Sequence, residues 1–173
     1  MPHNNTLYET VSHQTESAPY SLHYTKVQED TAPALYLHWH NEMEFLLLLE
    51  GELLFHIEDR SFLLHSGDGI FIPPGLLHYA TSNSSVPVSF RAFVFSPELI
   101  CSSFDTLTYN TYLLPVMHNN LPYALALRSV IPWQETILHY LQQIFREETT
   151  DELYVRGISL LIWNELYQHH ILT

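Results

Sequence analysis

Four residues of the types that bind metal ions occur at close spacing in two short segments of the chain. His38, His40 and Glu44 lie within the run HWHNEMEFLLLLEG, and His78 ends the run GDGIFIPPGLLH. Alternate side chains of a β-strand point to the same face, so His38 and His40 share a face, and Glu44 shares it if the strand continues. Three imidazoles and one carboxylate suit Zn, Fe, Ni or Mn, and the ligand set alone does not choose among them. The sequence therefore predicts a site for a divalent transition metal ion.

Short β-strands are the elements expected to position these residues. From Tyr20 to about Phe95, short apolar runs alternate with turn signals, which is typical of an antiparallel sandwich or barrel. One of these signals is the rigid turn Pro73-Pro74-Gly75, which would deliver His78 from a different strand. The others are Gly51 and the segments 58–60, 67–69 and 83–85. The metal site would then lie inside a small barrel.

The spacing of the four residues resembles the two sequence motifs of the cupin family. The pattern His38-x-His40-x3-Glu44-x6-Gly51 resembles the first motif, and Gly67-x5-Pro73-x-Gly75-x2-His78 resembles the second. The resemblance implies a mostly β protein with a small double-stranded β-helix barrel, in which the residues matching His38, His40, Glu44 and His78 hold the ion. It also implies that the glycines and the proline shape turns between strands.

Strand alternation also predicts which side chains line the inside of this barrel. If His38 and His40 face inward, the side chains that share their face should do so too, whereas Trp39, Phe45 and Leu47 should face outward. The candidates for an effector pocket are Tyr36, Leu46 and Leu48, together with Leu76 and Ala80, which flank His78. One aromatic side chain, several aliphatic ones and a few polar groups would suit a small molecule.

The pattern changes after Phe95 from strands to an irregular stretch and then to two helices. A first helix is expected from Pro132 to about Glu147, and a second is expected to begin near Asp151, a plausible N-cap. Both carry wide apolar faces, which need the flank of the barrel, a second subunit, or some of each as a partner. The candidates for a dimer interface are Ile158, Leu161, Ile162 and Glu165.

The order of barrel and helices adds a second resemblance. The phrase FVFSPELI, a later Trp133 and the apolar run ISLLIWNELY resemble the amino-terminal half of AraC-type transcription regulators, which binds the effector and dimerises. The resemblance implies a small-molecule effector, a homodimer and a helix-turn-helix DNA-binding domain just after the last helix. We therefore expect a polar segment at 1–20, a cupin barrel at 21–97, and an irregular connection with a helical dimerisation segment at 98–173. The DNA-binding domain is expected to be absent from this chain.

Composition restricts the partners of the segment. Six basic residues against 19 acidic ones give a formal net charge of −13, the wrong sign for a surface that binds a phosphate backbone. Any contact with DNA is therefore expected only through the missing domain. No run approaches the roughly 18 apolar residues of a membrane helix, the start lacks a secretory signal pattern, and there is one cysteine. A cytoplasmic, membrane-free protein without disulfides is expected.

Two functions from different classes remain. In the first, the chain is the sensor of a regulator, which its helical segment favours. In the second, it is a metal-dependent cupin enzyme such as a dioxygenase or isomerase, which its complete ligand set favours. No general base can be placed beside the metal from sequence, so a non-enzymatic role is preferred. His56, His65, Asp68 and Cys101 lie outside the motif ligands and are assigned structural roles or none.

Overall fold

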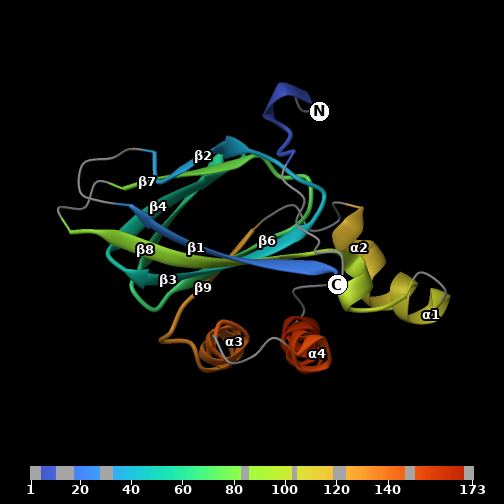
Figure 1. The fold of residues 1–173 in the computed structure, drawn as a ribbon. Coiled ribbons are helices and arrows are strands. Elements are labelled where there is room, and N and C mark those ends of the chain that lie inside the picture. Colours follow the sequence, from blue (N-terminus) through green and yellow to red (C-terminus); the bar gives the residue numbers. More distant parts are fainter. Residues whose placement is uncertain are drawn as a thin grey trace.

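The structure, a computed structural model, describes residues 5–10, 18–27, 33–82, 86–102, 105–118, 124–146 and 151–169. Two antiparallel sheets face each other and form a barrel (Figure 1). One sheet has the strand order β1-β8-β3-β6-β9, and the other has the order β2-β7-β4-β5. The strands are β1 (Tyr20–Val27), β2 (Leu35–His38), β3 (Met43–Glu50), β4 (Glu52–Ile57), β5 (Arg60–His65), β6 (Gly69–Ile72), β7 (His78–Thr81), β8 (Val88–Phe95) and β9 (Leu125–Leu127). The predicted fold class, a mostly β protein with a small barrel followed by helices, is confirmed.

Strand β3 has two buried faces, and each face belongs to a different hydrophobic core. Leu46 and Leu48 point into the core between the two sheets. Phe45 and Leu47 point the other way, into a core shared with the C-terminal helices. This is the alternation expected for a strand. Because both faces are covered, the strand reads as an unbroken apolar run rather than as alternating apolar and polar residues.

Two long helices, α3 (Pro132–Ile144) and α4 (Glu152–Gln168), cover the outer face of the five-stranded sheet (Figure 1). Helix α3 begins at the predicted proline, and its predicted end near Glu147 lies outside the described residues. Helix α4 begins after the predicted N-cap, where the Asp151 carboxylate accepts a 2.9 Å hydrogen bond from the backbone N–H of Leu153. The shorter helical turns are η1 (Asn5–Leu7), η2 (Pro97–Leu99), α1 (Thr106–Thr108), the π-helical η3 (Tyr109–Leu113) and α2 (Leu114–Met117). Within the described residues, no helix combines the length and apolar character that crossing a membrane requires.

The predicted dimer-interface residues of α4 are divided between its two faces. Ile158 and Ile162 are buried in the core that the helices share with the sheet, with Ile162 only 1% exposed. They present no surface to a second subunit, so the prediction for these two residues is wrong. Leu161 is 45% exposed, and Glu165 is half-buried beside His169. The amphipathic pattern predicted the apolar face of α4, but the barrel covers most of it.

Strand β9 comes from the stretch that was predicted to be an irregular connection. It pairs antiparallel with β6, with Ile70 opposite Ala126. Next to this pairing, the buried Asp68 carboxylate accepts a 2.7 Å bond from Arg128 Nη1 and a 3.1 Å bond from the backbone N–H of His65. Asp68 thus has the structural role expected from its glycine-flanked turn. Its ion pair with Arg128 joins that turn to the residue after β9.

We expect Asp68→Asn to lower the free energy of unfolding by about 2 kcal/mol, because it removes a charge-assisted hydrogen bond from a buried position. Urea denaturation monitored by tryptophan fluorescence measures this change. Asp59→Asn is the matched control, since Asp59 is exposed in the β4–β5 turn and its replacement should stay within about 0.5 kcal/mol of wild type. Equal stabilities for the two variants would contradict the role assigned to the Asp68–Arg128 pair.

Candidate metal centre

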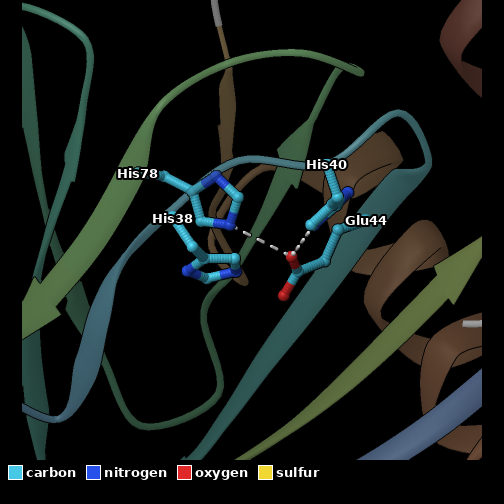
Figure 2. Close-up of side chains that lie close together, drawn as sticks. All are labelled: His38, His40, Glu44 and His78. Atoms are coloured by element: carbon cyan, nitrogen blue, oxygen red, sulfur yellow. Dashed lines mark hydrogen bonds and ion pairs between the residues drawn. The ribbon is translucent and has the colours of Figure 1, made fainter. Parts of the chain in front are cut away.

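Figure 2 shows His38, His40, Glu44 and His78 converging on one point inside the barrel. One ligand atom from each residue can be chosen so that all four atoms lie within 4.8 Å of one another. The Glu44 Oε2 atom is 3.2 Å from His40 Nε2 and 3.4 Å from His78 Nε2. The rings of His38 and His78 are 4.2 Å apart between centroids. The structure therefore brings together all four predicted metal ligands.

Pairing between strands sets the positions of the ligands. His38, the last residue of β2, lies directly opposite His78, the first residue of β7. The turn before His78 is joined to the other ligand segment, because the N–H of Gly75 donates a 2.8 Å hydrogen bond to the carbonyl of His40. Gly75 has a φ of +78°, a left-handed conformation that favours glycine. The proline–glycine turn and the first histidine pair are thus held as one unit.

Each histidine makes a backbone contact that fixes its tautomer. The Nδ1 atom of His38 lies 2.7 Å from the carbonyl of Tyr36, that of His40 lies 3.1 Å from the carbonyl of Glu42, and that of His78 lies 2.8 Å from the carbonyl of Leu76. A carbonyl only accepts, so each Nδ1 must carry the proton that it donates. In a neutral imidazole the other nitrogen, Nε2, then has a free lone pair. His38 and His78 are thereby prepared to bind through Nε2, whereas His40 Nε2 donates to the Glu44 carboxylate and would have to lose that proton before it could bind a metal ion.

Burial and charge act in opposite directions on the ionisable groups of this site. Burial lowers the pKa of His38, and the neighbouring His78 lowers it further. Burial also acts to lower the pKa of His40, but its hydrogen bond to the Glu44 carboxylate and the negative charges of Glu44, Glu9 and Glu42 together outweigh burial and raise that pKa. Burial acts to raise the pKa of Glu44, but the contacts with His40 and His78 hold that pKa well below its usual range. Glu44 is therefore an ionised carboxylate although it is only 4% exposed.

One buried atom of this site has no hydrogen-bond partner among the described residues, and it supplies a test of whether a metal fits. His78 is 1% exposed, and among the described residues its Nε2 atom makes no hydrogen bond, although Glu44 Oε2 is 3.4 Å away. Its Nδ1 proton is already donated to Leu76. A lone pair that faces a carboxylate is satisfied by a cation between them, and imidazole with carboxylate is a donor set for first-row divalent metals. The residues fit such an ion.

A cavity of about 180 Å³ opens beside two of these ligands. His38 and Glu44 form part of its wall, so a molecule in the cavity would lie next to the metal centre. The rest of the wall has three polar residues, which are Glu9 from the N-terminal segment and His23 and Thr25 from β1. Its apolar lining residues are Leu35, Phe90, Ala92 and Val94. The cavity has the size and mixed lining of a site for a small molecule.

The five residues predicted to line an effector pocket lie elsewhere. Leu46, Leu48, Leu76 and Ala80 are buried in the core between the sheets, outside the lining of this cavity. Tyr36 is 77% exposed, so the prediction that it faces inward is wrong. Strand β2 changes register between Leu35 and His38, and this bulge breaks the alternation on which the prediction depended.

Glu9, which was not among the predicted site residues, reaches the site from the N-terminal segment. Its backbone N–H donates a 2.9 Å hydrogen bond to the carbonyl of Trp39, and the N–H of Trp39 donates a 3.0 Å bond to the carbonyl of Leu7. This pairing places Glu9 Oε2 3.5 Å from His38 Nε2 and makes Glu9 part of the cavity wall. No local motif marks the residue, because only a contact between distant segments brings it there.

The remaining candidates lie away from the centre. His56 stacks on Tyr79 at 4.3 Å and lies 2.9 Å from the Ser61 hydroxyl, so it belongs to the sheet surface. His65 is largely exposed beside Glu52. Cys101 packs at the edge of the helix-covered core, and burial raises the pKa of its thiol. None of these side chains has a place in the candidate metal centre.

Comparison with known proteins places the chain in a family. A family model described as the AraC-like ligand binding domain matches residues 24–154. The chain belongs to this family. The resemblance to AraC-type regulators that the sequence suggested is thus confirmed, and the match covers the barrel and the start of α4.

One curated relative of this AraC-like ligand-binding domain is the uncharacterized HTH-type transcriptional regulator YdeC of Bacillus subtilis. The two are 31% identical over 170 residues, which cover 94% of this chain and 56% of the relative. The chain therefore spans little more than half the length of that regulator. These matches favour a regulatory protein over the alternative of a metal-dependent enzyme.

Among solved structures, ToxT from Vibrio cholerae matches with a TM-score of 0.57 and 12% identity, over 87% of this chain and 57% of that one. A structure of ToxT with a bound unsaturated fatty acid also has a TM-score of 0.57, with 9% identity, over 87% of this chain and 55% of that one. At such low identity the likeness shows the fold alone.

We expect nitrogen NMR of the metal-free domain to show the Nδ1–H tautomer for His78, because its Nδ1 atom donates to a carbonyl while its Nε2 atom has no hydrogen-bond partner among the described residues. His139, which is exposed on α3, should show the Nε2–H form that free imidazole prefers, and it serves as the internal reference. A two-bond proton–nitrogen correlation spectrum distinguishes the two forms. The Nε2–H tautomer at His78 would contradict the inward lone pair.

Proposed function

We propose that this domain is the sensing and dimerisation part of an AraC-type transcription regulator, and that it binds a divalent transition metal ion together with a small-molecule effector. The ion would be held by His38, His40, Glu44 and His78. DNA would be bound by a helix-turn-helix domain outside residues 1–173. The observation that carries the proposal is the buried, unpartnered Nε2 atom of His78, which faces an ionised carboxylate.

The proposed metal site is supported by how the chain orients its ligands. Three backbone carbonyls hold the imidazoles with Nε2 inward, which is the outer-shell support typical of metal-binding histidines. Glu44 remains ionised and offers one negative charge. A bound divalent ion would supply a Lewis acid for an oxygen or nitrogen atom of the effector. Zn, Ni, Fe and Mn all suit this donor set.

The proposed effector site is the cavity beside His38 and Glu44. One of its walls is strand β8, from which Phe90, Ala92 and Val94 face the cavity. The next residues on the same strand, including Phe93 and Phe95, pack against the helices. Effector binding would thus act on the strand that supports α3 and α4, and it would shift their equilibrium between two arrangements if the effector prefers one of them.

We expect the wild-type domain to bind one equivalent of Co²⁺ with d–d absorption bands, and its melting temperature to rise when the ion is added. At a hundredfold excess over Kd the gain is about 2.7 kcal/mol, or roughly 5–10 °C for a domain of this size. His38→Ala with His40→Ala should abolish binding. The double variant should stay folded, although about 1–3 kcal/mol less stable, because Glu44 loses its hydrogen bond from His40.

His56→Ala with His65→Ala is the matched control, because it removes two histidines that lie outside the centre. Its Co²⁺ spectrum should equal that of wild type. Loss of Co²⁺ binding in this control, or its retention in the His38/His40 variant, would contradict the proposed ligand set. Circular dichroism shows which variants are folded, so a binding defect can be told from unfolding.

The proposed dimer would use the exposed side of α4. Leu153, Tyr154, Leu160 and Leu161 recur at helical spacing on that side and remain 41–76% exposed. Leu160 also borders a hollow of about 260 Å³ between α4 and the π-helical turn η3. A row of exposed apolar side chains next to a hollow is typical of a surface that another protein covers.

We expect Leu161→Lys to convert the dimer into a monomer in sedimentation velocity at micromolar concentration, because it would place a charge in the centre of an apolar interface. Leu63→Lys is the control: Leu63 is 43% exposed on β5, in the other sheet. That variant should remain dimeric. A wild-type protein that sediments only as a monomer would contradict the proposed interface.

A further inference from the structure

We propose that Glu9 selects the effector by charge: its carboxylate lies on the ligand side of the metal centre, so that the cavity accepts neutral or cationic ligand groups and excludes small anions. The inference rests on the metal site proposed above and adds the chemical class of its ligand. That class is a small molecule with a lone pair for the metal and a hydrogen-bond donor, such as a hydroxyl, amide or ammonium group, for Glu9.

The backbone determines where the Glu9 carboxylate lies. The pairing of Leu7 and Glu9 with Trp39 joins the N-terminal segment to the residue between His38 and His40. The Tyr8 ring adds an edge-on contact with the Trp39 ring at 4.8 Å between centroids. The backbone of Glu9 is therefore held next to the segment that carries His38 and His40, and only the side-chain torsions of Glu9 remain to place its carboxylate.

The carboxylate reaches the open side of the metal centre. Its Oε2 atom is 3.5 Å from His38 Nε2, the nitrogen proposed to bind the ion. It lines the same cavity as His38 and Glu44 but is not among the four residues whose ligand atoms cluster within 4.8 Å. Glu9 is thus placed to meet a ligand in the cavity while the four inner residues hold the ion.

The charges around the cavity favour a neutral or cationic partner. A divalent ion with the carboxylates of Glu44 and Glu9 sums to zero charge. Among the described residues, the cavity wall contains no lysine or arginine. An incoming anion would therefore add an uncompensated charge in a partly buried site, close to a carboxylate that repels it. A repulsive group of this kind is a common way to build specificity against a class of ligands.

Glu9→Gln tests this inference, since it keeps the shape of the side chain and removes its charge. With Co²⁺ bound to the full 173-residue chain, azide and imidazole are titrated as an anionic and a neutral probe and followed by visible absorption. We expect Glu9→Gln to bind azide at least about tenfold more tightly than wild type, a change of about 1.4 kcal/mol. Its affinity for imidazole should stay the same or fall, so the variant loses the preference for the neutral probe.

Two further variants separate an effect inside the cavity from a general effect of charge. Glu42→Gln makes the same charge change close to another ligand, because Glu42 Oε2 is 3.8 Å from His40 Nδ1, but Glu42 is not part of the cavity wall. This variant should bind azide nearly as wild type does. Glu9→Asp keeps the charge and should also bind azide weakly.

The possible outcomes distinguish the inference from the metal site on which it rests. Unchanged azide affinity in Glu9→Gln, or an equal gain in Glu42→Gln, would overturn the role of Glu9 alone. Failure of wild type to bind Co²⁺ would overturn the metal site, and the charge selection with it.

Discussion

The feature on which the structure most depends is an ionised carboxylate, Glu44, buried among three imidazole rings. Removing a carboxylate from water is costly unless opposite charge or donors surround it. In the protein alone, the hydrogen bond from His40 supplies part of this compensation, and the Nε2 atom of His78 makes no hydrogen bond although it lies 3.4 Å from the carboxylate. The pairing of β2 with β7 and the bond from Gly75 to His40 hold the rings where a cation would complete the balance. These strands and this turn thus maintain an arrangement that a cation would stabilise.

The five-stranded sheet connects this site to the helices because its central strands β3, β6 and β8 are buried on both faces. Along β8, residues facing inward line the cavity and residues facing outward pack under α3 and α4. Two arginines add polar links: Arg91 on β8 donates to the carbonyl of Phe145 after α3, and Arg156 on α4 donates to the carbonyls of Glu98 and Leu99. A displacement of β8 would therefore be transmitted to both helices through packed side chains and these hydrogen bonds.

The sequence was most informative where spacing alone determines geometry. The motif spacing identified the four residues that converge, and strand alternation separated Leu46 from Phe45. The second inference needs only a regular strand, whereas the first came from the family motif, because the four ligands lie on β2, the loop after it, β3 and β7. Alternation failed at Tyr36 because a bulge in β2 changes the register, and a bulge has no clear signature in a single sequence. Other features depend on contacts between distant segments: the three residues of β9 are too few to show a periodic pattern, and the apolar face of α4 did not reveal whether the barrel or a second subunit would cover Ile158.

The position of Glu9 makes metal and effector interdependent under the proposed function. Without an ion, the cavity wall carries the two carboxylates Glu9 and Glu44, and a neutral ligand would meet no positive charge from the described wall residues other than protonated histidine. With an ion, the charges of the ion and of the two carboxylates sum to zero. The ion would then accept a lone pair of the ligand, and Glu9 would accept a hydrogen bond from it. Linkage then requires that each partner raise the affinity for the other by the same factor. A domain built in this way would respond to the effector only while metal is available, so one site would combine two signals.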